Sequence, residues 1–304
     1  MIHRFVASWL LRGGAIAGVL LCSSPAAAFC RTTTCATRSA DPTCVRDPNG
    51  CWVAGAPLYW ESSCTSYSVQ QDGSPNLGID YDTAVTLAVG AFAHWPAAMC
   101  GEQFPSISVE DFGPASCNRP EYNPTGPNAN VIMFRDQSWT HASTALALTT
   151  VTFNTTNGKI LGADMEINST GAFPLDANNL RYVLTHESGH FFGLDHSQDS
   201  SAIMYFQYTL PGSNAPDPVL TPDDVAAICA TYPPDRVATE CRFEPALGFA
   251  PNCGGDVTGG CSVGQVTRAN GSPVGPGEAA LLLGTLLALA RKRRRGARTR
   301  PTRG

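Results

Sequence analysis

The central part of this 304-residue sequence has little positive charge. Ten of the twenty basic residues, but all twenty-five acidic residues, lie between residues 29 and 290, so this part carries a net charge of −15. Such a surface repels the phosphates of nucleic acids and of anionic lipids. We therefore expect neither DNA, RNA nor an anionic membrane surface as a partner of this part of the chain.

Long apolar runs are also scarce. The segment Ala279–Ala290 is almost wholly apolar, but as a helix it would span only about 18 Å of a bilayer core near 30 Å. A permanent membrane span is therefore marginal. A cluster of basic residues, 291–295, follows this segment and predicts a cytoplasmic stop by the positive-inside rule. The alternative interpretation of this cluster is a nucleic-acid patch.

The C-terminal end resembles a bacterial sorting tail of the MYXO-CTERM type. The features that carry this resemblance are the G-G-C-S-V-G string around Cys261, the short apolar segment and the basic stop. The resemblance implies that residues 274–304 are read by envelope sorting machinery, with Cys261 as the attachment or cleavage point.

The N-terminal end predicts export. Residues 1–28 contain Arg4 and Arg12, an apolar stretch at 15–21 and three alanines before Phe29. This order is typical of a secretory signal peptide that is cleaved after Ala28. We expect the protein to be secreted or attached to the cell envelope.

The cysteines lack the paired C-x-x-C spacing of a zinc module, which argues against such a module at Cys30–Cys51. Outside the leader and Cys261, ten cysteines remain, an even number that predicts up to five disulfides in an oxidising compartment. The sequence does not predict their connectivity. They are Cys30, Cys35, Cys44, Cys51, Cys64, Cys100, Cys117, Cys229, Cys241 and Cys253.

No internal repeats are present, and the composition suggests one sizeable core with extensions. We expect a cysteine-rich N-terminal arm at residues 29–56 and a catalytic domain at 57–234. A linker with glycines and cysteines at 235–273 precedes the predicted tail.

Histidine is rare, yet three of the six histidines lie in H-E-S-G-H-F-F-G-L-D-H, residues 186–196. On a helix, His186 and His190 project from one face and can bind the same ion. Glu187 is then placed to act as a general base without being a ligand. Gly193 allows the chain to leave the helix and return His196 to the ion. Three protein ligands with an open fourth position predict a catalytic zinc.

The alternative interpretation is that these histidines are ordinary surface or core residues. A helix built only for packing has no reason to contain Gly189 and Gly193, each of which weakens a helix by about 1 kcal/mol relative to alanine. The complete spacing therefore favours the zinc site.

This pattern resembles the metzincin clan of zinc endopeptidases, whose motif H-E-x-x-H-x-x-G-x-x-H is matched at every specified position. Ser197 after the third histidine is typical of the matrixins within that clan. Met204 in S-A-I-M-Y fits the Met-turn, whose methionine packs beneath the zinc. Some metzincins have a tyrosine ligand two positions later. Here that position is Phe206, so Tyr205 and Tyr208 are not assigned as ligands.

The resemblance implies a zinc metalloendopeptidase with one catalytic Zn²⁺ per chain, bound by His186, His190 and His196. It would hydrolyse protein or peptide substrates with zinc-activated water and Glu187 as the general base. Substrate would lie along the edge strand Thr144–Val151, and residues near Val183 and at 206–218 would select its side chain. We expect a monomer. The alternative is a noncatalytic surface protein that uses a metzincin fold for binding or adhesion.

The sequence also departs from the matrixin pattern. The propeptide string P-R-C-G-x-P-D is absent, and whether a cysteine of the N-terminal arm keeps the zinc latent instead is left open. Outside the leader and the motif only His94 and His141 remain, too few for a second, three-histidine zinc site. Calcium is a further possibility, because Asp164 and Glu166 alternate in G-A-D-M-E-I-N. Equally, they are solvent-facing strand carboxylates.

The expected fold class is α+β, a twisted mixed sheet with about three helices. The 82–99 segment has apolar residues at helical spacing, a second helix carries the zinc motif, and 221–232 opens with a threonine cap and proline. Short strands are predicted at 106–109, 130–134, 144–153 and 159–168, with a turn at 155–158.

Overall fold

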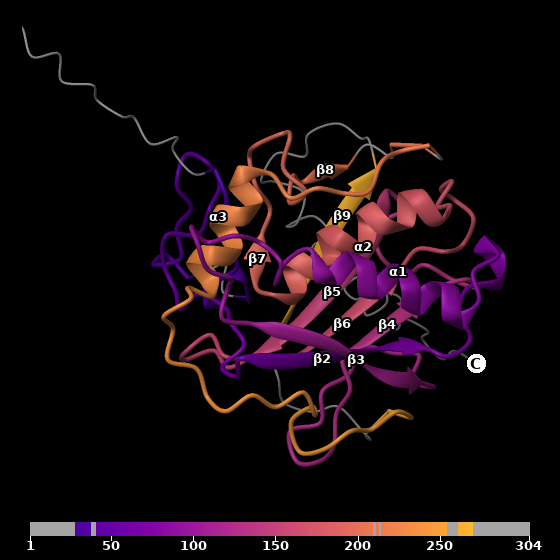
Figure 1. Cartoon of the computed structure of the whole chain (residues 1–304), viewed down its shortest axis with the longest axis horizontal. Coiled ribbons are helices and arrows are strands. Elements are labelled where there is room, and N and C mark those ends of the chain that lie inside the picture. Colours follow the sequence, from indigo (N-terminus) through magenta and orange to yellow (C-terminus); the bar gives the residue numbers. More distant parts are fainter. Residues whose placement is uncertain (1–27, 38–40, 209–210, 213, 254–260, 270–304) are drawn as a thin grey trace, which may run out of the picture.

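The computed structural model describes residues 28–37, 41–208, 211–212, 214–253 and 261–269. It confirms the α+β class: a twisted mixed sheet has two helices packed side by side on one face and a third helix beside them (Figure 1). Residues 1–27 of the predicted signal peptide and the apolar and basic tail lie outside the described residues. Within those residues, no helix is long and apolar enough to cross a membrane.

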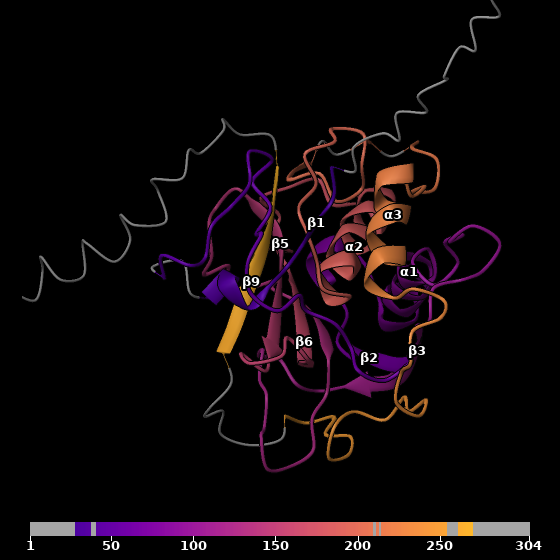
Figure 2. The same cartoon turned by 90° about the vertical axis from the view of Figure 1, so that its left-hand side faces the viewer.

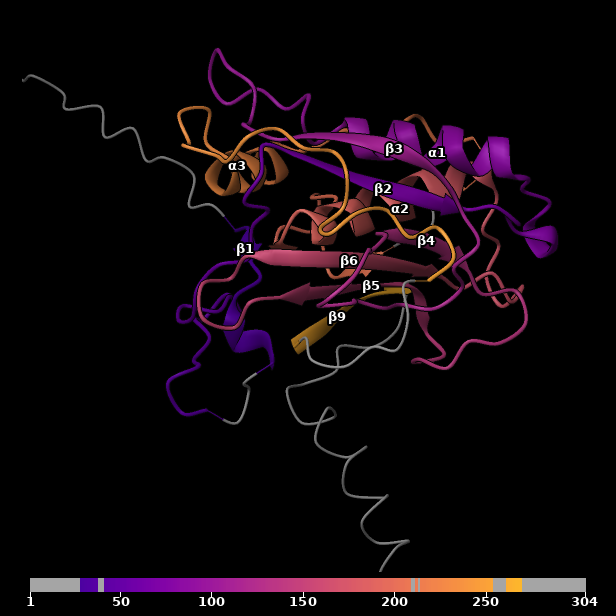
Figure 3. The ribbon, with the colours of Figure 1, turned by 90° about the horizontal axis from the view of Figure 1, so that it is seen from below.

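The main sheet has seven strands in the order β3-β2-β4-β6-β5-β9-β8. The first four are parallel to one another, β5 runs antiparallel to both β6 and β9, and β8 is parallel to β9. Seen from below, β9 lies beyond β5, on the side of the sheet away from β2 and β3 (Figure 3). The strands are β2 (Cys64–Gln70), β3 (Ser108–Ala115), β4 (Val131–Phe134), β5 (Ala145–Phe153), β6 (Ile160–Ile167), β8 (Gln207–Tyr208) and β9 (Cys261–Ala269).

A second, two-stranded sheet attaches the N-terminal arm to the body. Its strands are β1 (Cys30–Arg31) and β7 (Leu194–Asp195), paired antiparallel. The helices are α1 (Tyr81–Ala93), α2 (Ala177–Phe191) and α3 (Pro222–Thr231), with short 3-10 turns η1 (Thr34–Thr37) and η2 (Pro75–Leu77).

The end of α1 differs from the prediction. The apolar pattern predicts a helix to residue 99, but α1 ends at Ala93. Pro96 explains the early end, because a proline disfavours helical geometry in the residue before it and lacks the N–H needed to continue the helix. The start of α3 is confirmed: Thr221 and Asp224 form a reciprocal capping box, with proline in the first turn.

Trp95, two residues after the end of α1, helps to join that helix to α2. Trp95 is fully buried, and its indole N–H lies 2.8 Å from the Ser188 hydroxyl and 3.1 Å from the Thr185 carbonyl. Phe92 packs edge-on against Phe191 at the end of α2. The two helices therefore form a single layer against the sheet, and this layer fixes the helix that carries the histidine motif.

Five disulfides join the ten cysteines that were expected to pair. Two lie within the N-terminal arm, Cys30–Cys51 and Cys35–Cys44. The other three join segments far apart in the sequence: Cys64–Cys241, Cys100–Cys229 and Cys117–Cys253. Two of these three hold residues 235–253, which contain no helix or strand, against the sheet.

Disulfide removal is expected to affect stability according to the length of chain that each bond closes. Cys100–Cys229 closes 129 residues and Cys35–Cys44 only 9. On the loop-entropy argument, Cys100→Ala/Cys229→Ala should cost about 2 kcal/mol more unfolding free energy than Cys35→Ala/Cys44→Ala. Urea unfolding of the two variants beside the parent measures this. Equal losses would show that the loop-closure term does not govern these bonds.

Candidate metal centre

Three imidazole rings meet at the end of α2. His186 and His190 lie on the helix, and His196 follows β7. The Nε2 atoms of His186 and His190 are 3.1 Å apart, and one ligand nitrogen from each of the three rings lies within 4.8 Å of the others. A tetrahedral ion with bonds of about 2.0–2.1 Å requires ligand atoms at this kind of separation. The predicted histidines are therefore together in space.

The orientation of the two helical rings is set by backbone carbonyls. His186 Nδ1 lies 2.6 Å from the Ile203 oxygen, and His190 Nδ1 lies 2.9 Å from the Leu194 oxygen. An Nδ1–H that donates to a carbonyl leaves Nε2 with its lone pair, which is the form that binds a metal. Both Nε2 atoms thus offer a lone pair at the point where the rings meet.

Burial keeps these rings neutral. It lowers the pKa of His186 to about 4 and the pKa of His190 well below its ordinary value, and the neighbouring histidines lower the latter further. Neutral imidazole is the ligand form, so no proton has to leave either ring at pH 7 before a metal binds. The donor set fits a zinc ion.

The return of the chain to His196 depends on a glycine. Gly193 has φ +89°, and a Cβ there would lie 2.7 Å from the Leu58 carbonyl oxygen. Its own carbonyl accepts a hydrogen bond from the Thr32 N–H at 3.0 Å, next to the β1–β7 pair. The sequence predicted this turn. It did not predict that the N-terminal arm would brace it.

Met204 lies beneath the helix at the level of the histidines. It is 1% exposed, and its carbonyl accepts a hydrogen bond from the Ser197 N–H at 2.7 Å. A Cβ on Gly189 would lie 2.2 Å from the Met204 sulfur and 2.8 Å from a Trp95 ring carbon. The glycine in the last turn of α2 is therefore required by the close approach of this methionine.

Asp224, in the first turn of α3, is a structural residue of the site that sequence analysis did not identify. Its buried carboxylate accepts the N–H groups of Ile203 at 2.9 Å and Met204 at 3.0 Å. Ile203 in turn provides the carbonyl that orients His186. The acidic residue two positions after a helix-opening proline was the only sequence signal, and it indicated a cap alone.

Glu187 lies on the same helix and is fully buried. The Thr149 hydroxyl on β5 is 2.5 Å from Glu187 Oε2 and 3.3 Å from the Glu187 carbonyl. Sequence analysis assigned no role to Thr149. Its position in an alternating strand carries no mark of this contact.

The N-terminal arm contacts the third histidine's loop from another side. Asp223 Oδ1 accepts the N–H groups of Ala28 at 2.7 Å and Phe29 at 2.9 Å, and Oδ2 accepts the Ser197 hydroxyl at 2.6 Å. Because all four cysteines of residues 30–51 are in disulfides, none provides a thiolate that could cap a metal.

The two carboxylates considered for calcium are occupied by protein donors. Asp164 accepts the N–H groups of Val131 at 2.9 Å and Glu121 at 3.0 Å, one on each oxygen. Glu166 binds Arg135 at 2.6 Å and His141 at 3.1 Å. Both side chains are 5% exposed, so they are not the solvent-facing pair of the alternative interpretation either.

Among the described residues, one other cluster has metal-ligating side chains close together: Cys117, Glu121 and Cys253. Its two cysteines are joined in a disulfide and have no thiolate to offer. For residues 28–37, 41–208, 211–212, 214–253 and 261–269, the histidine cluster is therefore the one with chemistry suited to zinc.

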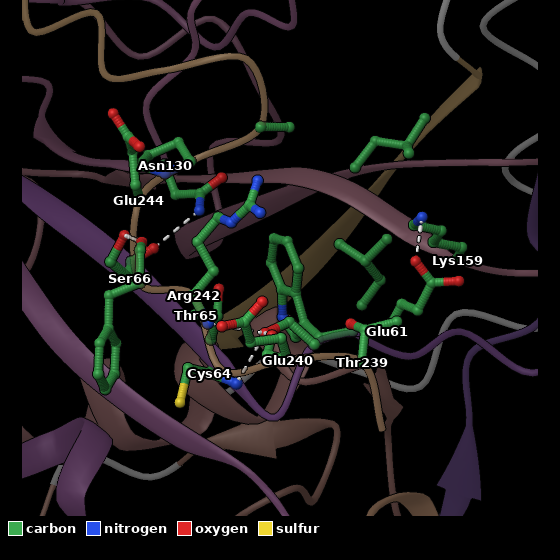
Figure 4. Close-up of a pocket in the computed structure, with 17 residues that line it drawn as sticks. Glu61, Cys64, Thr65, Ser66, Asn130, Lys159, Thr239, Glu240, Arg242 and Glu244 are labelled. Carbon is green, nitrogen blue, oxygen red and sulfur yellow. Dashed lines mark hydrogen bonds and ion pairs between the residues drawn. The ribbon is translucent and has the colours of Figure 1, made fainter. Parts of the chain in front are cut away.

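A separate pocket of about 360 Å³ lies where residues 239–246 cross the sheet (Figure 4). Most of its polar groups are paired with one another. The Ser66 hydroxyl donates to the Phe243 carbonyl, the Asn130 side-chain amide donates to the Ser66 carbonyl, and Lys159 forms an ion pair with Glu61. No histidine lines it. We interpret it as incomplete packing between the sheet and residues 235–253, which two disulfides hold against it.

Comparison with known proteins gives the site a family context. Residues 113–233, from β3 to just past α3, match the profile of the matrixin family, peptidase family M10. Residues 113–233, the matrixin-like domain, are thus similar to this family. The match includes all three histidines, Glu187 and Met204, and it supports a zinc metalloprotease.

Individual relatives of the matrixin-like domain are matched over short segments. Human matrix metalloproteinase-20 is 37% identical over 100 residues, which cover 31% of this chain and 19% of that protein. A probable matrix metalloproteinase of invertebrate iridescent virus 3 is 29% identical over 96 residues, 30% of this chain and 25% of its own. Bovine (Bos taurus) interstitial collagenase is 44% identical over 62 residues, which cover 20% of this chain and 12% of that protein. The chain thus spans at most about a quarter of these relatives.

Gly189→Ala is expected to destabilise the matrixin-like domain. The added methyl group must displace Met204 or Trp95, and overpacking of this kind costs about 1–3 kcal/mol. Gly90→Ala in α1 is the control, because a Cβ there meets nothing within 4 Å and should stabilise the helix by up to about 1 kcal/mol. Thermal unfolding of both variants compares them. A stabilised Gly189→Ala would contradict the packing role of the glycine.

Proposed function

We propose that this protein is a zinc-dependent metalloendopeptidase that hydrolyses peptide bonds in protein substrates. The observation that carries the proposal is the convergence of His186, His190 and His196 beside Glu187. The matrixin match supports the same chemistry, since it covers this motif. Zinc, once bound, makes water acidic enough to be deprotonated near neutral pH and polarises a carbonyl group.

The residues of the chain have distinct tasks in this proposal. His186, His190 and His196 hold the ion and leave a coordination position open. Glu187 takes the proton of the attacking water and delivers it to the nitrogen of the leaving amine.

Thr149 is proposed as a positioning residue. Its hydroxyl donates to one oxygen of Glu187 at 2.5 Å, which fixes the rotamer of the carboxylate. Met204 and Gly189 are proposed to support the ligand helix by direct packing. None of these three residues would bind the ion.

The site of action is proposed to be extracytoplasmic, as a secreted or envelope-attached enzyme. The five disulfides support an oxidising compartment. The leader, the sorting tail, the monomeric state and the domain boundaries stay predictions from the sequence, as does calcium binding. A noncatalytic binding role is not favoured, because both the ligand set and Glu187 are intact.

Glu187→Gln is expected to lower kcat for a fluorogenic peptide by about 10²–10⁴-fold, since general-base catalysis contributes that much. The substitution keeps the size of the side chain and the Thr149 contact, so zinc content should stay at one ion per chain. The assay is run on zinc-loaded full-length protein, with metal content measured alongside.

The matched control is Glu110→Gln, an exposed carboxylate on β3 at the opposite edge of the sheet. It should leave the rate unchanged. Chelation should abolish the activity of the parent, and added zinc should restore it. The endopeptidase assignment would be refuted if the parent and a chain ending after Cys253 each loaded one zinc yet cut no member of a peptide library.

A further inference from the structure

The last described strand of the chain lies alongside the candidate site. β9 pairs antiparallel with β5 along its length, from Phe153↔Cys261 to Ala145↔Arg268, and parallel with β8 at Gln207↔Arg268. It also contacts α2 and η1 of the N-terminal arm. Figure 2 shows β9 beside β5, with the arm crossing near it.

The register of this pair places the middle of β9 opposite the proposed base. Thr149 on β5, whose hydroxyl contacts Glu187, is the pairing partner of Gln265. The flanking pairs are Thr150↔Gly264 and Leu148↔Val266. The backbone of β9 therefore runs past the catalytic groups in an extended conformation.

This position is the one that an extended peptide substrate needs. Without β9, the outer edge of β5 would present unpaired N–H and C=O groups, and such an edge binds peptides by adding them as a strand. β8, which follows the Met204 turn, would form the other rim. A polypeptide that approached Glu187 along β5 would thus replace β9.

The exposure of the catalytic groups agrees with an occupied site. His186, Glu187 and His190 are each 0% exposed, and His196 is half-buried. A base that must act on a polypeptide needs access to it, so this arrangement corresponds to a closed site.

We infer that Cys261–Ala269 is an intramolecular inhibitory strand, which occupies the peptide-binding edge of β5 and excludes substrate until it is displaced. Its effect on catalysis rests on the function proposed above. A short connection runs from Cys253, which is anchored to Cys117 by a disulfide, to the start of β9 at Cys261. Such a tether gives the strand an effective concentration on the order of mM at β5.

The test uses full-length, zinc-loaded Val263→Pro/Val266→Pro. In an antiparallel sheet, the N–H groups of every second residue point to the same neighbouring strand. Positions 263 and 266 are an odd number of residues apart, so one of the two N–H groups points toward β5. One proline therefore removes a hydrogen bond to β5 whichever set faces it. Val257→Pro, which lies before the strand begins, is the matched control.

Two readouts are expected to change in the double variant and not in the control. Amides of β5 should exchange hydrogen faster, which reports the loss of β9 without any turnover. The kcat/KM for a fluorogenic peptide should rise about tenfold or more, as expected if the open state is populated about 10% or less in the parent. A chain ending after Cys253, which keeps all five disulfides, should behave like the double variant.

The strand should also act when supplied separately. A synthetic peptide of residues 262–269, S-V-G-Q-V-T-R-A, should inhibit the double variant competitively, and a scrambled peptide should not. In the Glu187→Gln background a fluorescent form of the same peptide should bind the double variant and not the parent. This binding measurement stands even if the protein proves not to be a peptidase.

The following results would overturn the inference. One is equal β5 exchange in the parent and the double variant, which would mean that β9 does not cover the edge. Another is unchanged kcat/KM in a double variant whose β5 amides have become exposed. Cleavage of the parent within residues 261–269 during the assay would show that the segment is a substrate and not an inhibitor. If neither the parent nor the double variant cleaved any substrate, while the peptide still bound the double variant and not the parent, only the proposed function would be contradicted.

Discussion

Three imidazole rings from two different backbone elements must present their nitrogens at one point, and the surrounding structure is arranged around this requirement. A helix supplies His186 and His190 at the correct spacing without further help. His196 needs a sharp turn at Gly193 and a loop held in position afterwards. That loop is braced by the N-terminal arm through β1, by Asp223 through Ser197, and by Asp224 through the Met204 turn. Residues far apart in the sequence thus stabilise the position of one ligand.

The features predicted from sequence are those that depend on the spacing of residues close together in the chain. The ligand motif and the threonine cap with proline at the start of α3 each lie within about three helical turns, so their residue types reveal the geometry. Thr149 and Asp224 were not assigned to the site because each contact joins segments 20 or more residues apart, as in the Thr149 bond to Glu187. β9 was missed for the same reason. Residues 261–269 form a strand because they pair with the edge of β5, which lies more than 100 residues earlier in the chain.

The disulfides explain how segments with little regular structure can take part in this arrangement. Residues 29–56 and 235–253 have few helices or strands of their own, so they cannot bury enough apolar surface to fold independently. Cross-links restrict their unfolded conformations and keep them against the sheet at a smaller entropic cost. The arm can therefore brace the His196 loop, and Cys253 can serve as the fixed point from which the chain proceeds to β9.

The exchange of β9 for a substrate strand would be nearly balanced in main-chain hydrogen bonds. Each bond broken between β5 and β9 can be replaced by one between β5 and the incoming peptide, and the net contribution of one such bond is only about 0.5–1.5 kcal/mol. Closure therefore depends chiefly on the tether, which keeps β9 at high local concentration. A long protein substrate that also contacts β8 and the surrounding surface can compete with it, whereas a short peptide cannot do so easily. On this argument β9 restricts the active site to partners that bind over an extended surface.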